Sequence, residues 1–174
     1  MEKKFELTDN FIINAFGVKL FQIKCTKSFK YAKEGDLGGY VEKDENLDQK
    51  GNAWVYGNAE VSGNARVSGN AEVYGDARVY GDARVSGDAE VSGDAEIDNN
   101  NKHCGFDCFG SANHHAHAYL TKENKVEITC GCFRGSIEEF EKRVEETHSG
   151  TIYEKQYKAI IDVIKIKFGL TDLI

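Results

Sequence analysis

Apolar and polar positions alternate with a strict period of six between residues 51 and 98. The stretch reads GNAWVY, GNAEVS, GNARVS, GNAEVY, GDARVY, GDARVS, GDAEVS and GDAEID, with no insertion between hexads. Gly opens each hexad, Asn or Asp follows, Ala is third, and Val or Ile is fifth. A repeat of six residues is typical of a β-helix, so this segment predicts a stack of coils around which the chain is organised.

Alternation inside each hexad predicts which side chains face the core of the coil. Successive side chains of a strand point to opposite faces, so Ala53 and Val55 are expected inside, and Trp54 and Tyr56 are expected to face water. If three hexads make one coil, residue i lies over residue i+18, about 4.8 Å away. About three coils then form three inner ladders: Val55, Val73 and Val91; Val61, Val79 and Ile97; Val67 and Val85.

The outward positions then gather on three faces. The first face holds Trp54, Tyr56, Glu72, Tyr74, Glu90 and Ser92; the second holds Glu60, Ser62, Arg78, Tyr80, Glu96 and Asp98; the third holds Arg66, Ser68, Arg84 and Ser86. Aromatic residues are enriched in interface hot spots, but they also form ladders that only stabilise a sheet. Both interpretations stay open. The candidate protein-interaction surface consists of Trp54, Tyr56, Tyr74, Tyr80, Glu72 and Glu90.

The flanking segments predict a cap at each end. Residues 1–40 are expected to form an N-terminal β cap, with strands within 4–29, a turn at 14–17 and a loop over 30–39. The solenoid is expected over 41–98, because Val41 and Leu47 are already six apart, although residues 48–50 shift the phase by two. At the outer corners, Asp76 is expected over Asp94, an unfavourable pair of like charges.

Residues 99–174 predict a C-terminal α+β capping domain. We expect an irregular stretch to residue 111, then a hairpin with strands 116–121 and 125–130. Ser136 with Glu139, and Thr151 with Glu154, have the spacing of capping boxes that begin two helices. The expected buried stripes are Ile137, Phe140 and Val144 on the first helix, and Tyr153, Tyr157, Ile160, Ile164 and Phe168 on the second.

Charge and composition narrow the function. The net charge is −7, and residues 41–98 hold 13 acidic and 5 basic groups, which disfavours direct binding of nucleic acid. No apolar run approaches the length of a membrane span and the N-terminus lacks an apolar signal core. Five cysteines, an odd number, argue against a secreted disulfide framework. A cytoplasmic protein is therefore expected.

Two segments carry a resemblance to a known group of proteins. GDLGGYVEKDENL with QKGNAWVYGNA, and CGCFRGSIEEFEKRVEETH with the helix after it, resemble phage and prophage hexapeptide-repeat proteins. Such proteins are often described as acyltransferases or polymer-forming proteins. The resemblance implies a left-handed parallel β-helix and, by analogy, a homotrimer, but no single activity. The stretch from His103 to His117 departs from that group in its content of Cys and His.

Candidate chemistry is sparse. Hexapeptide acyltransferases resemble one another in placing a catalytic His on the coil surface, but residues 1–102 contain no His, so this enzyme class is disfavoured. A weak zinc hypothesis rests on His103, Cys104, Cys108, His115, His117, Cys130 and Cys132, whose spacing lacks the usual Cys-x2-Cys pairs. Buried thiols and surface histidines explain the same residues without a metal. No glycine-rich phosphate loop supports a nucleotide-binding sponge.

These observations favour a non-catalytic protein-binding or scaffold protein of phage or prophage type. The expected partner is a protein, and by the resemblance a host bacterial one, for example a component of bacterial defence. A hexapeptide acyltransferase and a zinc-stabilised or small-ligand-binding protein are the alternatives. No cofactor is expected.

Overall fold

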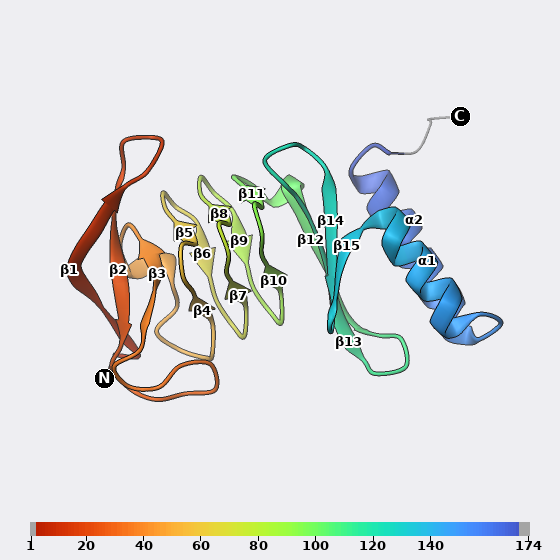
Figure 1. Ribbon diagram of the computed structural model, residues 1–174, viewed down its shortest axis with the longest axis horizontal. Coiled ribbons are helices and arrows are strands. Elements are labelled where there is room, and N and C mark those ends of the chain that lie inside the picture. Colours follow the sequence, from red (N-terminus) through yellow and green to blue (C-terminus); the bar gives the residue numbers. More distant parts are fainter. Residues whose placement is uncertain (1–2, 171–174) are drawn as a thin grey trace. The chain divides into compact units, whose positions relative to one another are not determined.

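The hexads form a β-solenoid of about three turns, in which each hexad contributes one short strand. A computed structural model describes residues 3–170 of the chain. The solenoid strands are β4 (Trp54–Val55), β5 (Glu60–Val61), β6 (Arg66–Val67), β7 (Glu72–Val73), β8 (Arg78–Val79), β9 (Arg84–Val85), β10 (Glu90–Val91) and β11 (Glu96–Ile97). Figure 1 shows these strands on successive coils, as the period of six predicts.

Parallel pairing confirms that one coil contains 18 residues. The strand orders are β10-β7-β4, β5-β8-β11 and β6-β9, and each pairing joins residues 18 apart, such as Val55 with Val73. The inner valines and alanines are almost completely buried, so the three predicted ladders fill the solenoid. Burial of each Val contributes about 1.5–3 kcal/mol, and no coil could stabilise itself without its neighbours.

The corners of the solenoid are joined by side-chain amides. Asn58 Nδ2 donates to Asp76 Oδ1 one coil further on, at 3.2 Å. Asn64 donates to Asp82 in the same way, at 3.1 Å. Asparagine in the early coils therefore supplies a donor to the aspartate stacked on it, where two stacked carboxylates would repel.

The first coil begins before the regular repeat. β3 (Leu37–Val41) pairs with β5, with Val41 opposite Val61, a separation of 20 residues rather than 18. The predicted phase shift of two residues is therefore confirmed. Gly38 and Gly39 already belong to β3, so the expectation of a loop through residue 39 is wrong. At Gly39 an added Cβ would lie 2.7 Å from the Ala59 carbonyl oxygen, which explains the need for glycine.

The N-terminal cap is an antiparallel hairpin that extends one sheet of the solenoid. β1 (Phe5–Ile13) pairs with β2 (Lys19–Cys25), and β2 pairs with β3, which gives a sheet of order β1-β2-β3-β5-β8-β11. In the predicted turn, Asn14 Oδ1 accepts hydrogen bonds from the amides of Phe16 and Val18. A short helix, η1 (Asp44–Asn46), follows β3.

The chain divides into two compact units at Asn100/Asn101. η2 (Asn100–Lys102) spans this boundary. The second unit contains a four-stranded antiparallel sheet, β12-β13-β14-β15, whose middle pair, β13 and β14, is the predicted hairpin. Its strands are β12 (His103–Phe109), β13 (His114–Leu120), β14 (Val126–Cys130) and β15 (Phe133–Ser136). The expectation of an irregular stretch before residue 111 is wrong, because β12 pairs with β13 along most of its length.

Two helices pack on one face of this sheet. α1 (Ile137–His148) begins at Ser136, whose side chain accepts from the Glu139 amide in the predicted capping box. α2 (Ile152–Lys167) begins at Thr151, which accepts from the Glu154 amide. The predicted stripe of α1 is buried. On α2 the buried residues are Tyr157, Ile160, Ile161 and Ile164, so the prediction omitted Ile161. It was wrong for Tyr153, which is exposed, and Phe168 is only half-buried.

Candidate functional site

The third face of the solenoid carries two arginines in register. Arg66 on β6 is the backbone partner of Arg84 on β9, so the two side chains start about 4.8 Å apart. Ser68 and Ser86 follow on the same two coils. Both arginines are exposed, and neither forms an ion pair with any of residues 3–170. Two like charges that stack in this way repel each other by a few tenths of a kcal/mol to about 1 kcal/mol.

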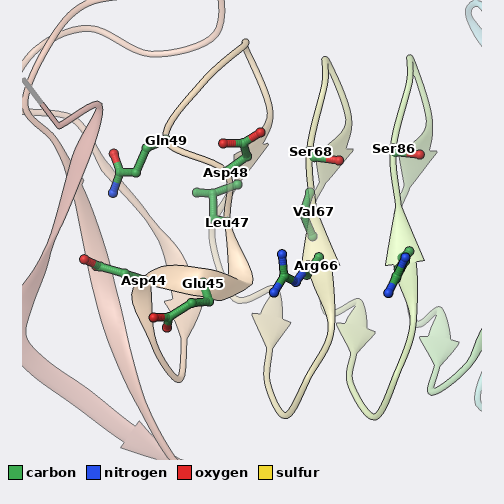
Figure 2. Close-up of a pocket in the computed structure, with 10 residues that line it drawn as sticks. Asp44, Glu45, Leu47, Asp48, Gln49, Arg66, Val67, Ser68 and Ser86 are labelled. Atoms are coloured by element: carbon green, nitrogen blue, oxygen red, sulfur yellow. The ribbon is translucent and has the colours of Figure 1, made fainter. Parts of the chain in front are cut away.

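A groove of about 610 Å³ runs along this face. Its lining consists of Asp44, Glu45, Leu47, Asp48, Gln49, Arg66, Val67, Ser68, Arg84 and Ser86. Figure 2 shows Asp44 and Glu45 on the short helix at one end, with Ser68 and Ser86 on successive coils toward the other. The groove is therefore acidic where the first coil enters it and basic further along.

Hydrogen bonds of the first coil fix the position of the acidic end of the groove. The buried Asn46 amide donates to the carbonyl oxygens of Gly63 and Ala65, at 3.2 and 2.9 Å, which fixes η1 against the solenoid. The Asp48 amide donates to the Val67 carbonyl at 2.9 Å, as in a regular coil. Asp44 accepts a hydrogen bond from Lys3 at 2.5 Å. These contacts place carboxylates beside the groove without using the arginines.

The second face shows how this solenoid otherwise accommodates an arginine. Arg78 has Glu60 and Glu96 as its backbone partners on the coils before and after it. Its Nε lies 3.8 Å from Glu60 Oε1. Charge therefore alternates from coil to coil at this position of the second face. The third face has no such alternation, and its guanidinium groups are free to bind a carboxylate or phosphate, which arginine does in a bidentate manner.

The prediction that Trp54 faces water is wrong. Its side chain is 1% exposed, because residues of the N-terminal cap cover it. The ring packs edge-on against Phe5 and Phe29, with centroids 6.4 and 5.4 Å away. Lys4 reaches over the same region and donates to the Ala53 carbonyl at 2.8 Å. Trp54 therefore anchors the cap and cannot be a contact residue on the surface.

The tyrosines of the predicted interaction surface engage the glutamates of the next coil. Tyr56 donates to Glu72 at 2.7 Å, and its ring lies edge-on to that of Tyr74, at 6.5 Å. Tyr74 donates to Glu90 at 3.5 Å. Burial raises the pKa of Tyr56 well above its usual value. These residues are half-buried, and their contacts favour the interpretation as a stabilising ladder.

Tyr80 repeats the same contact on the second face. Its hydroxyl donates to Glu96 at 2.7 Å, and burial raises the pKa of Tyr80 to about 12. Its ring packs on Phe16 of the N-terminal hairpin, with centroids 5.1 Å apart. Tyr80 therefore lies on a different face from Tyr56, and the six predicted residues do not form one surface. The spacing of 16 residues between each tyrosine and its glutamate was the available signal for this ladder.

The seven candidate zinc ligands are not assembled into one site. His103, His115 and His117 share one face of the C-terminal sheet, whereas Cys104 and Cys130 pack with the core beneath the helices. Cys108 and Cys132 are exposed. Within residues 3–170 no group of three His, Cys, Asp or Glu is arranged to hold a metal ion.

The three histidines lie in a row, in which His103 and His117 are hydrogen-bonded and the His115 ring lies beside that of His117. His103 Nδ1 and His117 Nε2 lie 3.0 Å apart, and His115 Nδ1 lies 2.5 Å from Asp107 Oδ1. Burial lowers the pKa of His103 to about 4, so it is neutral near pH 7. An added Cβ at Gly105 would lie 2.7 Å from the His115 ring. The glycine therefore leaves the space that the His115 ring fills.

The C-terminal unit has a smaller cleft, of about 240 Å³, between its sheet and helices. Its lining includes Cys130, Cys132, Phe133, Phe140, Arg143, Val144, His114, His148 and Tyr157. The His148 ring stacks on Tyr157 at 5.4 Å, and burial raises the pKa of Tyr157 to about 12. The sequence pointed to Cys130 and Cys132 only as candidate zinc ligands and predicted no cleft, because the cleft combines residues from three strands and two helices.

The stacked coils define the chain as a repeat β-solenoid protein. Within the solenoid, residues 59–75, 71–87 and 77–93 match the family model described as YdcK Beta solenoid repeat. No curated protein matches the chain. Among the described residues, no helix is both long enough and apolar enough to cross a membrane.

Proposed function

We propose that the protein is a non-catalytic binding protein that holds a segment of another protein in the groove of its third face. The observation that carries this proposal is the stacked pair Arg66 and Arg84, which have no carboxylate partner among residues 3–170 although the solenoid is rich in acidic residues. On the second face the same position of the repeat alternates in sign. On the third face two arginines stack instead, their repulsion lowers the stability of the solenoid, and a bound acidic group would offset that repulsion.

The charges along the groove favour a partner segment that carries both signs of charge. A segment that places a carboxylate on the two arginines would place neighbouring residues beside Asp44, Glu45 and Asp48. A basic side chain there would be favourable, whereas a second acidic group would be repelled. We therefore expect a segment with one acidic and one basic residue a few positions apart. A nucleic acid fits less well, because its phosphates would meet the acidic end.

The partner we favour is a bacterial host protein, because of the resemblance to phage and prophage hexapeptide-repeat proteins. A component of bacterial defence is one such partner. This part of the proposal rests on the resemblance and not on the groove.

The test is capture of partners from a bacterial lysate, followed by measurement of direct binding with the purified partner. Wild type is compared with the double variant Arg66→Gln, Arg84→Gln and with the matched control Arg78→Gln. Loss of both arginines should weaken binding by about a hundredfold or more, since hot-spot arginines contribute 2 kcal/mol or more each. The control should bind like wild type. Equal binding by wild type and the double variant would refute the role of the groove.

A second candidate function is supported by the cleft of the C-terminal unit. Its lining is largely aromatic and aliphatic, and Arg143 lies there without an ion pair among residues 3–170. Such a site suits a small apolar anion, for example an aromatic carboxylate. Titration of the purified protein with benzoate, followed by amide NMR shifts, should perturb residues around Phe133 and Phe140, and Arg143→Gln should weaken the effect. Shifts that are absent or spread evenly over the protein would exclude this second function.

A further inference from the structure

Helix α2 has a second apolar stripe on the side away from its buried face. Ile152, Val163 and Ile166 are 62%, 48% and 67% exposed, and Ala159 is exposed between them. At 100° per residue, these four positions fall within about 60° of one another around the axis. The buried residues of α2 are centred about 140° away. The two stripes are therefore separate surfaces.

A helix that covers one face of a sheet needs only one apolar stripe. Isolated apolar residues on a surface are common and require no explanation. Here, however, the exposed residues recur from the first turn of α2 to its last at helical spacing, which is the pattern of a packed face. Exposed apolar residues that recur in this way mark an interaction site.

The stripe is complementary to itself when two copies pack in opposite directions. With a two-fold axis at Ala159, Ile152 of one copy lies opposite Ile166 of the other, and the reverse holds by symmetry. The two copies of Ala159 meet at the crossing point, where a small side chain allows close approach.

The charges beside the stripe show the same symmetry. Lys155 and Asp162 are seven residues apart, so they lie on the same flank of α2. Neither forms an ion pair within the described part of the chain. In the antiparallel arrangement, Lys155 of each copy lies close to Asp162 of the other, which gives two ion pairs. In a parallel pair, the two-fold axis would place this flank of each copy on opposite sides of the contact, so these ion pairs could not form.

We propose that α2 binds α2 of a second copy of this chain, antiparallel and centred on Ala159. A single helix pair makes a small interface, so the expected dissociation constant is on the order of micromolar. This dimer uses neither the solenoid groove nor the cleft of the C-terminal unit, and it is independent of the proposed function.

The test is sedimentation velocity over roughly a hundredfold range of protein concentration, because the mass of a dissociating dimer depends on concentration. Wild type should pass from monomer to dimer. Lys155→Asp and Asp162→Lys should each raise the dissociation constant about tenfold, since each places like charges opposite each other. The double variant with both exchanges should restore it. Lys142→Asp, on the exposed face of α1, is the matched control and should leave it unchanged.

Far-UV circular dichroism establishes that each variant is folded before its mass is compared. A wild type that stays monomeric throughout the range would overturn the proposal and leave the stripe to a different partner. Self-association that none of the charge variants alters would place the contact on another surface. A stable trimer would do the same, and either result would also overturn the proposal.

Discussion

The burial of Trp54 leads to the most direct prediction about stability. Trp54→Ala removes the only tryptophan of the sequence from a site that is 1% exposed. The indole packs edge-on against Phe5 and Phe29, which belong to the N-terminal segment, while Trp54 belongs to the first regular hexad. The substitution therefore removes the contact that joins the cap to the solenoid.

The size of the effect follows from the buried area. An aromatic side chain of this size buries about 150–250 Å², which at about 25 cal/mol per Å² gives roughly 4–6 kcal/mol. Truncation of Phe or Trp to Ala in protein cores costs about 3–5 kcal/mol. We therefore expect Trp54→Ala to lower the free energy of unfolding by about 4 kcal/mol. Trp54→Phe keeps one ring against Phe5 and Phe29 and should cost only about 1–2 kcal/mol.

The assay is urea denaturation followed by far-UV circular dichroism, with wild type, Trp54→Phe and Trp54→Ala compared under one set of conditions. In wild type, tryptophan fluorescence should also shift to the red on unfolding, because the indole leaves an apolar site. If Trp54→Ala costs less than about 1 kcal/mol, or if the native fluorescence matches that of the unfolded chain, the side chain is exposed and the reasoning fails.

Three further changes test other contacts. Burial lowers the pKa of Lys4 to about 8 from 10.5, so the unfolded state binds more protons than the folded state between these two pH values. The free energy of unfolding of wild type should therefore rise by about 3 kcal/mol from pH 8 to 10.5, relative to that of Lys4→Met, as measured by urea titration. Gly39→Ala should cost about 1–3 kcal/mol in the same assay, because its Cβ would lie 2.7 Å from the Ala59 carbonyl oxygen, and an unchanged midpoint would contradict the close approach. Tyr56→Phe should cost about 1 kcal/mol, since it removes the hydrogen bond to the half-buried Glu72, and Glu72→Gln should reduce the further effect of Tyr56→Phe in a double-mutant cycle.

The solenoid was predictable because its period appears directly in the sequence. The repeat of Val at every sixth position implies the ladder of Val55, Val73 and Val91, and the register of the strands confirms it. The helices were predictable for a similar reason. Ser136 and Thr151 supply caps at sequence spacings that only a helix start uses, and an apolar stripe follows each.

The errors arose where contacts join residues that are distant in the sequence. Within its hexad Trp54 occupies an outward position, and only the packing of Phe5 and Phe29 against it makes that position buried. β12 was missed because its sequence, HCGFDCF, lacks a clean alternation of apolar and polar residues. Within the strand, Cys108 has a φ of 59°. The pairing partner of β12, and not its own pattern, makes it a strand.

The arrangement of the solenoid surface explains why binding and stability can be separated on its third face. Alanine and valine at the inner positions fix the coils, so the outer positions are free to vary. On the first two faces those positions are used for contacts between coils, such as Tyr56 with Glu72 and Arg78 with Glu60. Within the described part of the chain, the side chains of Arg66 and Arg84 form no such contact, and the two like charges repel each other. Removal of both should therefore leave the free energy of unfolding unchanged or raise it slightly, while binding in the groove is lost. If these arginines instead stabilise the solenoid, their removal should lower the free energy of unfolding and leave binding in the groove unchanged.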